Sequence, residues 1–376
     1  MRIVIFCHSL ISDWNHGNAH FLRGVGSELR ARGNQVTYYE PEDAWSMQGM
    51  LAEQGEPAIA RFKTAYPELS SVRYRPDALD LDRALDGAGL VLVHEWNDPE
   101  LVRRIGERHR RGRFVLFFHD THHRAVTAPD EMARYDLSDY DGVLAFGEVL
   151  RQIYLARGWT NLAFTWHEAA DARRFRPLEG ATRPRDVVFL GNWGQDRTAE
   201  LDELFLEPVK ALGLRATVQG VRYPPEVKQR LADAGVAHTG WVPNFVVPLV
   251  LGQFKATVHI PRRPYARALP GIPTIRVFEA LCCGIPLVSA PWEDSESLFT
   301  PGEDFLVARD GAQMRRHLAL LVKDREAAQA MAARGRKTVL ARHTCAHRVD
   351  ELLALHAKLR PGGSPGARYA AVSAGA

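Results

Sequence analysis

"MRIVIFCHSLISDWNHGNAHFLRGVGSELRARGNQVTYYE", residues 1–40, carries the pattern that decides the fold. An apolar run at 2–7 is followed by an amphipathic stretch at about 18–32 and by a second apolar run at 35–39. Continuous apolar runs are typical of buried strands, and apolar residues that recur with the helical period are typical of a helix packed on a sheet. This stretch therefore predicts a strand, a helix and a second strand parallel to the first.

The same alternation continues through most of the chain. The segment 41–80 is the exception, because it is rich in charge and proline, and we expect a helical insertion with loops there. The chain as a whole is predicted to be an α/β protein with two Rossmann-like domains. Further strands are predicted at 90–94, 114–119, 142–146, 162–166, 187–191, 215–220, 256–260 and 304–308, and further helices at 99–110, 198–211, 225–234 and 311–359.

The domain boundary is predicted near residue 180. The stretch "RFRPLEGATRPRD", 174–186, gathers prolines, a glycine and many charges, as interdomain linkers do. We expect the two domains to face each other across a cleft at the carboxyl ends of their strands, where open α/β sheets bind ligands. The predicted parts are an N-terminal Rossmann-like domain at 1–178, a C-terminal Rossmann-like domain at 185–345, a C-terminal helix at 346–360 and a disordered tail at 361–376.

Composition narrows the possible partners and the location. Among the 376 residues, 46% are hydrophobic and 25% are charged, and the formal net charge is +3. The basic residues are spread along the chain, which argues against a nucleic-acid surface. The four cysteines have neither CxxC nor disulfide-framework spacing, the chain starts directly with a strand-like run, and no apolar stretch is long enough to span a bilayer. We expect a cytoplasmic protein whose membrane contact is at most peripheral.

A helix start in the second half is the strongest candidate for a phosphate site. In "TIRVFEALCCGIPLVS", 274–289, Thr274 is placed to cap a helix that begins at Ile275 and ends at Gly284. Backbone amides at such a start, preceded by "PGIP", form a natural cradle for a diphosphate.

Two charged side chains of the same helix extend this interpretation. Arg276 can donate to the phosphates, and Glu279 can accept hydrogen bonds from two ribose hydroxyls. The alternative is that Arg276 and Glu279 form an ordinary ion pair on the helix surface. The spacing alone leaves both open.

Together with "FTPGEDFLVARD", 299–310, this stretch resembles the donor-binding region of GT-B glycosyltransferases, specifically the group similar to the spore maturation protein CgeB. The resemblance implies a GT-B fold in which 1–178 is the acceptor domain and 185–345 is the nucleotide-sugar donor domain. It also implies that Glu279 holds the ribose of a nucleotide sugar. Enzymes of family 4 usually carry another glutamate eight residues earlier, where this chain has Gly271. Retention and inversion of the sugar configuration therefore both stay open.

The resemblance also covers 9–41, 166–177 and 187–201. In related enzymes, basic side chains near the last of these segments contact the donor phosphates, and Arg197 is the matching candidate. The alternative is an arginine that faces water at a helix start. Arg262, which follows a strand together with Arg263, is a further phosphate candidate.

The candidates for acid–base chemistry lie in the first half. "SDWNHGNAHF", 12–21, follows the first strand and offers Asp13, His16 and His20. By the resemblance, a histidine of this loop is the general base of an inverting reaction. Asp120 follows another strand and can orient His16 or His20, and Glu95 and His119 are expected near the same edge. The histidines of "HDTHH" lack a second cluster of ligands, so no metal site is predicted.

The predicted activity is a metal-independent, hexosyltransferase-like glycosyl transfer from a nucleoside diphosphate sugar to an unidentified small molecule, glycan or protein. No cofactor is expected besides the nucleotide sugar as co-substrate. Two alternatives stay open: a nucleotide-sugar epimerase, which needs no acceptor, and a non-catalytic nucleotide-sugar binding module.

Overall fold

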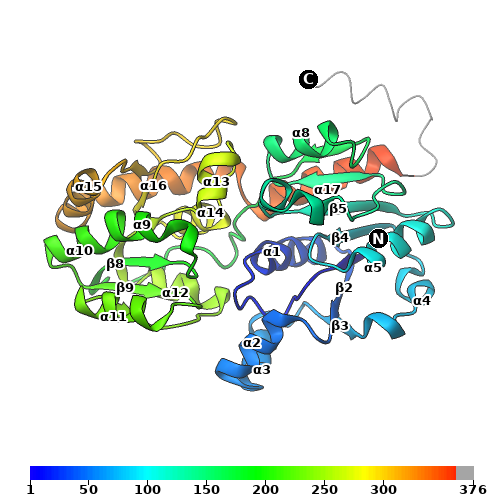
Figure 1. The fold of residues 1–376 in the computed structure, drawn as a ribbon, viewed down its shortest axis with the longest axis horizontal. Helices are drawn as coiled ribbons and strands as arrows, with labels where there is room; N and C mark the ends of the chain where they lie inside the picture. Colours follow the sequence, from blue (N-terminus) through cyan, green and yellow to red (C-terminus); the bar gives the residue numbers. More distant parts are fainter. Residues whose placement is uncertain (361–376) are drawn as a thin grey trace. The chain divides into compact units, whose positions relative to one another are not determined.

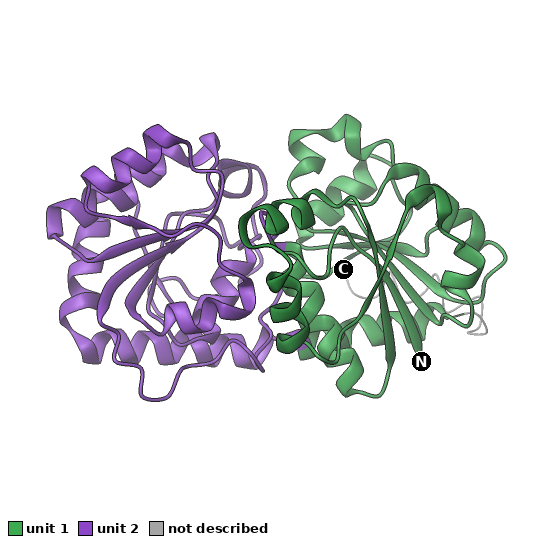
Figure 2. Ribbon diagram, turned by 90° about the horizontal axis from the view of Figure 1, so that it is seen from below, with its two compact units in different colours: residues 1–13, 18–167, 346–376 green, residues 14–17, 168–345 purple. Residues whose placement is uncertain are grey.

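The computed structural model describes residues 1–360 and separates into two compact units (Figure 2). Unit 1 consists of residues 1–13, residues 18–167 and the C-terminal segment from 346 onward, and unit 2 consists of 14–17 and 168–345. The contacts thus divide the chain after His167, whereas the sequence placed the boundary near 180. The tail predicted at 361–376 lies outside the described residues.

Unit 1 is built on a parallel sheet with the strand order β3-β2-β1-β4-β5-β6-β7 (Figure 1). Its central strands are buried on both faces, which agrees with their continuous apolar sequence. The order reverses beside β1, the kind of position at which open α/β sheets bind ligands. The strands are β1 (Arg2–Phe6), β2 (Gln35–Pro41), β3 (Ser71–Tyr74), β4 (Leu90–His94), β5 (Val115–Asp120), β6 (Gly142–Ala145) and β7 (Ala163–Thr165).

The predicted insertion contains two helices and, beyond the prediction, an edge strand. Strand β3 pairs parallel with β2, with Ser71 opposite Tyr38. Val72 and Arg73 are exposed, so this strand lacks the apolar run that revealed the others. The helices of unit 1 are α1 (Asn18–Ala31), α2 (Trp45–Gln54), α3 (Pro57–Ala65), α4 (Leu81–Leu85), α5 (Pro99–His109), α6 (Arg124–Thr127), α7 (Pro129–Met132), α8 (Glu148–Ala156) and α17 (Cys345–Leu359).

Unit 2 repeats the architecture with a six-stranded parallel sheet of order β10-β9-β8-β11-β12-β13. Helices lie on both faces of this sheet (Figure 1). The strands are β8 (Arg185–Leu190), β9 (Ala216–Gln219), β10 (Ala237–His238), β11 (Phe254–His259), β12 (Leu287–Ser289) and β13 (Leu306–Val307). The helices are α9 (Thr198–Leu201), α10 (Glu207–Leu212), α11 (Pro225–Asp233), α12 (Val247–Leu251), α13 (Arg263–Ala268), α14 (Ile275–Cys282), α15 (Gly311–Lys323) and α16 (Arg325–Arg342).

The long helical region predicted at 311–359 consists of three helices. The break between α15 and α16 falls at Asp324, whose side chain caps α16 by accepting from the amide of Ala327 at 2.9 Å. The last helix, α17, packs within unit 1, where the indole of Trp166 donates to the Arg348 carbonyl at 2.8 Å. No helix among residues 1–360 is long and apolar enough to cross a membrane.

Helix α14 is the most deeply packed helix start of unit 2. Every residue of this helix except Arg276 is buried. Phe278 and Leu281 belong to the core cluster that also contains Phe254 and Phe305. Because this packing fixes the axis of the helix, it also fixes the direction of the backbone amides at its N-terminus.

Candidate functional site

The loops after β8 and β9 are tied together at the carboxyl edge of the unit 2 sheet. The amide of Gly191 donates to the Gln219 carbonyl at 2.9 Å, and the Asn192 side chain accepts from the Val221 amide at 3.0 Å. A Cβ at position 220 would stand 2.1 Å from the Gly191 carbonyl oxygen. This close approach of two backbones requires a glycine at position 220. Together with the hydrogen bonds, it fixes the loops after β8 and β9 against each other.

Arg197 joins two of these strand ends. Its guanidinium donates to the Ile260 carbonyl at 2.9 Å and also to the Asn192 carbonyl, and it lies 5.2 Å from the ring centre of Phe189. The side chain is half-buried rather than directed into water, and burial lowers its pKa. Arg197 therefore brings positive charge to the edge and also holds the loops after β8 and β11.

Arg262 and Arg263 are paired with carboxylates of the preceding helical segment. Arg262 donates to Asp196 at 2.8 Å, and Arg263 makes two bonds to Glu200 at 2.8 and 3.0 Å. The Arg262 side chain is 42% exposed. An exposed pair of this kind opens at little cost, so Arg262 is able to turn toward an anion.

Thr274 stands at the N-cap position of α14, but its side chain does not cap the helix. Its hydroxyl lies 3.0 Å from Nε2 of His259, while Nδ1 of that ring lies 2.9 Å from the Ser289 hydroxyl. Ser289 donates its hydrogen to the Ala290 carbonyl. It therefore accepts from Nδ1 of His259, and Nε2 accepts from Thr274. Burial holds the pKa of His259 at about 3, so this ring is neutral.

A carboxyl group that the sequence analysis missed lies beside the same helix start. Glu168 is buried, the Ile275 amide donates to it, and Glu279 is a nearby like charge. Burial first and repulsion by Glu279 second raise the pKa of Glu168 to about 8. At neutral pH, Glu168 is therefore mostly protonated and adds little negative charge to the site. The sequence offered one signal for Glu168, namely that it follows shortly after the end of strand β7.

Arg276 and Glu279 do form an ion pair, and the pair is largely buried. Glu279 is 1% exposed, and one carboxylate oxygen accepts from Arg276 at 2.7 Å. The other oxygen accepts from the side-chain amide of Asn244 at 2.8 Å. Asn244 begins a short 3-10 helix, Asn244–Val246, that lies far away in sequence, so only the structure identifies it as a residue that orients Glu279.

The "PGIP" stretch before α14 lies against the loop after β12. Gly271 has φ = +85°, and its amide donates to the Glu293 carbonyl at 2.7 Å. A Cβ at position 271 would stand 2.6 Å from Oε1 of Glu296 and 2.8 Å from Oγ of Ser295. At the position where the resemblance predicts a glutamate, this chain has Gly271, which has no side chain. The carboxylate of Glu296, from the loop after β12, lies next to its backbone.

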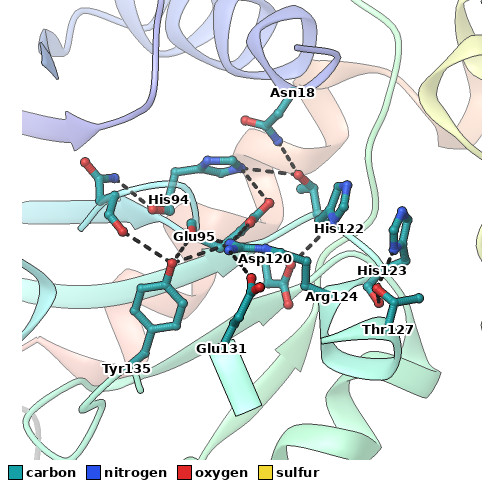
Figure 3. A network of polar contacts seen from close by, with 12 residues as sticks. Asn18, His94, Glu95, Asp120, His122, His123, Arg124, Thr127, Glu131 and Tyr135 are labelled. Carbon is teal, nitrogen blue, oxygen red and sulfur yellow. Dashed lines mark hydrogen bonds and ion pairs between the residues drawn. The ribbon is translucent and has the colours of Figure 1, made fainter. Parts of the chain in front are cut away.

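The carboxyl edge of unit 1 holds buried carboxylates (Figure 3). Arg124 donates to the Glu95 carboxylate, and the hydroxyl of Tyr135 donates to the Glu95 backbone carbonyl. Asp120 accepts from the Tyr154 hydroxyl at 2.8 Å and from the His122 amide at 2.9 Å. Burial is the main reason that the pKa values of both Glu95 and Asp120 are raised, and repulsion between the two adds to the effect at Glu95.

His119, near the end of strand β5, is a core residue. His119 is fully buried among the rings of Phe21, His94 and Trp166. Neither of its ring nitrogens has a hydrogen-bond partner within the described chain. Burial lowers its pKa to about 3, so the ring is neutral. His119 therefore contributes packing to this edge.

Asp13 is tied to the fold rather than directed to a substrate. Its carboxylate pairs with Arg23 at 2.5 Å, and both side chains are buried. Arg23 also donates to the carbonyls of Leu10 and Ile11 at 2.7 and 2.8 Å. A single buried guanidinium thus holds the loop that leads from β1 toward His16.

The two histidines predicted as bases fall in different units. His16 is buried and belongs to the short segment 14–17 of unit 2, in which Asn15 accepts from Asn192 at 3.0 Å. His20 is half-buried in α1 of unit 1, the unit that also contains Asp120. Within residues 1–360, no three or more His, Cys, Asp or Glu side chains are grouped so as to hold a metal ion.

Comparison with solved structures identifies this architecture. The fold is that of GT-B glycosyltransferases. The structure resembles sucrose-phosphate synthase from Thermosynechococcus elongatus, with 14% identity, 96% of this chain and 99% of that chain covered, and a TM-score of 0.65. It also resembles Anabaena HepE in complex with UDP, with 13% identity, 96% and 100% covered, and a TM-score of 0.67.

A third GT-B structure of similar shape is an alpha-glucosyltransferase in complex with UDP and a 13-mer DNA containing an HMU base. The identity is 10%, 95% of this chain and 100% of that chain are covered, and the TM-score is 0.67. Residues 197–354 match the family model described as "Glycosyl transferase-like". No curated protein matches the chain. The prediction of a GT-B fold is thus confirmed, the glycosyltransferase likeness is shown for residues 197–354, and the narrower CgeB-like grouping stays a resemblance.

The GT-B fold brings most of the predicted donor-site residues to one sheet edge. Arg197, Thr274, Ile275, Arg276 and Glu279 all lie at or beside the ends of β8 and β11 or at the start of α14. Their roles in binding stay predictions.

Proposed function

We propose that the protein is a glycosyltransferase that moves a sugar from a nucleoside diphosphate sugar to an acceptor, with the donor bound at the carboxyl edge of unit 2. The observation that carries the proposal is the buried start of α14, where backbone amides and Arg276 lie beside neutral His259, mostly protonated Glu168 and the Glu279 carboxylate that pairs with Arg276. Support comes from the GT-B fold and from the family match at 197–354, which includes this helix.

The diphosphate of the donor would bind at the amides that begin α14. A helix start carries a positive dipole end, and Arg276 adds a guanidinium. The Ile275 amide, which donates to Glu168 in this structure, would exchange this carboxyl for a phosphate oxygen. Arg197 and Arg262 would add positive charge at the neighbouring strand ends. Glu279 would take the ribose hydroxyls, because a carboxylate is a strong hydrogen-bond acceptor and Asn244 and Arg276 hold this one in place.

The chemistry follows from this placement of charge. The bond between the sugar carbon and the diphosphate oxygen breaks, the electron pair leaves with the diphosphate, and the acceptor oxygen forms the new bond. The sugar passes through an oxocarbenium-like transition state, while arginines and helix amides balance the charge that develops on the leaving group. His16, His20 or Asp120 would take the proton of the acceptor hydroxyl. No metal ion takes part in this proposal.

The nucleotide and the sugar can be chosen for a first test from the solved neighbours. HepE of Anabaena was solved with UDP, with UDP and glucose, and with UDP-glucose. We therefore propose a hexose linked to UDP as the first donor to test. A CgeB-like subgroup is part of the proposal, and the acceptor and the stereochemistry stay open.

The proposal is tested by titrating the protein with nucleoside diphosphates by calorimetry in the presence of a chelator. We expect one diphosphate to bind, and we expect Glu279→Ala to weaken this binding by about 1.5–3 kcal/mol, the cost of a lost charged hydrogen bond. Glu279→Gln keeps the size of the buried side chain and guards against a folding defect. Glu226→Ala, an exposed position of the same unit, is the matched control.

Three outcomes separate the alternatives. Absence of binding of every diphosphate to the folded wild-type protein, or unchanged affinity in folded Glu279 variants, contradicts the donor site. Conversion of the nucleotide sugar without an acceptor into its epimer indicates an epimerase. Binding with neither reaction indicates a non-catalytic module.

A further inference from the structure

The loop 291–300, which follows β12, is held firmly although it has no regular secondary structure. Both oxygens of Asp294 accept backbone hydrogen bonds, from Leu298 at 2.9 Å and from Phe299 at 2.8 Å. The Leu298 carbonyl lies 2.9 Å from the His343 ring, and the Leu298 and Phe299 side chains are buried. These contacts leave the loop little freedom to move away from its neighbours.

The backbone of this loop is also strained at one residue. Ser297 has φ = +53°, in the left-handed region that residues other than glycine, asparagine and aspartate rarely adopt. Such a conformation persists only where surrounding contacts impose it. The strained residue directly follows Glu296 in the chain.

Glu296 and Ser295 converge on the backbone of Gly271. Oε1 of Glu296 and Oγ of Ser295 lie 2.6 and 2.8 Å from the position that a Cβ of residue 271 would occupy. The amide of Gly271 holds the two loops together through the carbonyl of Glu293 at 2.7 Å. The Glu296 carboxylate and the Ser295 hydroxyl thus lie next to Gly271, three residues before the N-cap residue of α14. The Glu296 side chain is half-buried.

The charge of Glu296 is unsuited to the diphosphate itself. A carboxylate beside a phosphate repels it, whereas a carboxylate is a strong acceptor for neutral hydroxyl groups. In a nucleoside diphosphate sugar, the group that follows the second phosphate is a ring covered with hydroxyls. A fixed acceptor next to the phosphate cradle therefore matches hydroxyl groups and not the phosphates. Because the proposed function gives the ribose hydroxyls to Glu279, the hydroxyls left for Glu296 are those of the donor sugar.

We infer that Glu296 accepts hydrogen bonds from hydroxyl groups of the donor sugar and so determines which sugar is bound. This inference rests on the proposed function, because it needs a donor at α14. Ser295 would assist as a second polar contact. Gly271 leaves the space that lets both side chains approach, since any side chain there would collide with the Glu296 carboxylate.

The test compares binding of UDP with binding of UDP-glucose, UDP-galactose and UDP-N-acetylglucosamine by calorimetry. We expect Glu296→Gln to leave the UDP affinity within twofold of wild type and to weaken the preferred UDP-sugar about tenfold, as for one lost charged hydrogen bond. Glu293→Gln is the matched control, since it lies in the same loop, has an exposed side chain and contacts Gly271 only through its backbone. Its affinities should equal those of wild type.

A second measurement identifies the hydroxyl. Deoxy analogues of the preferred UDP-sugar, each lacking one hydroxyl, should bind wild type more weakly, and one of them should show no further loss in Glu296→Gln. Equal weakening of UDP and UDP-sugar in Glu296→Gln, or no weakening of either, would overturn the inference while the donor site stands. Failure of wild type to bind any diphosphate would instead overturn the proposed function.

Discussion

The two sheets of this protein have the same parallel architecture, but their carboxyl edges carry opposite chemistry. At the edge of unit 1, the buried acids Glu95 and Asp120 have raised pKa values, and the pKa of buried His119 is lowered. At the edge of unit 2, arginines and the start of α14 dominate. The comparison teaches that the strands set where a site lies, and that the few residues after each strand set what the site can bind.

The difference has a direct physical meaning. At the unit 1 edge, burial shifts the pKa values of Glu95, Asp120 and His119 toward their neutral forms, so these groups suit contacts with neutral groups and proton exchange. The groups at the unit 2 edge keep positive charge, so they suit an anion. We therefore assign the diphosphate to unit 2 and the acceptor to unit 1 as parts of the proposal.

The largest effect is expected from the buried ion pair that holds the first loop of unit 1. Arg23→Ala removes the buried guanidinium that pairs with Asp13 and that donates to the carbonyls of Leu10 and Ile11, so we expect a loss of about 3–5 kcal/mol in the free energy of unfolding. Urea denaturation measures it. Arg262→Ala, which breaks an exposed pair in unit 2, should cost at most about 1 kcal/mol. Similar losses in both variants would remove this contrast between the units.

The next effect concerns the charge of the unit 2 edge. Arg276→Ala should weaken binding of the diphosphate by about 1.5–3 kcal/mol, because it removes a charged donor next to the helix amides. Arg124→Ala removes a guanidinium at the unit 1 edge and should leave this affinity unchanged. Calorimetry measures the diphosphate affinity of both variants. A loss of affinity in Arg124→Ala alone would move the diphosphate site from unit 2 to unit 1.

The sequence predicted the strands that are buried on both faces of a sheet, because such strands are continuous apolar runs. Strands such as Leu90–His94 are uninterrupted apolar runs and were predicted without error. The edge strand Ser71–Tyr74 escaped detection because half of it faces water. The approach of Glu296 to Gly271 and the bond from Asn244 to Glu279 join segments distant in sequence, so neither has a local signal.

The pH dependence of stability tests the buried acid of unit 2. The pKa of Glu168 is about 8 in the folded chain and about 4.5 in the unfolded chain. Between these values the folded state holds a proton that the unfolded state has released, so stability falls as pH rises from about 4.5 to 8. Glu168→Gln should resemble wild type at low pH and exceed its stability by on the order of 1–3 kcal/mol above this window. Denaturation at both ends of the window measures this, and equal stability at high pH would contradict the assignment.

The smallest change in the free energy of unfolding is expected for His119 of unit 1. Replacement of the buried His259 of unit 2 should have a larger effect. His119→Leu loses no hydrogen bond within the described chain, so its free energy of unfolding at neutral pH should change by less than about 1.5 kcal/mol. His259→Leu loses contacts with Thr274 and Ser289 and should cost about 1–3 kcal/mol.

The same two histidines predict behaviour in acid. Both rings are neutral when folded, with pKa values of about 3, and ionise near 6.5 when unfolded. Stability should therefore fall as pH drops below about 6.5, and each leucine variant should lose part of this dependence. Unchanged acid sensitivity in both variants would contradict the burial of these rings.

The most direct test of the central claim is hydrogen–deuterium exchange of the full chain with and without saturating UDP, read by mass spectrometry. The account predicts slower exchange in the segments 189–198 and 270–279 of unit 2 and no change in the segment 90–124 of unit 1. Protection confined to unit 1, or no protection in either segment of unit 2 while UDP is bound, would contradict it.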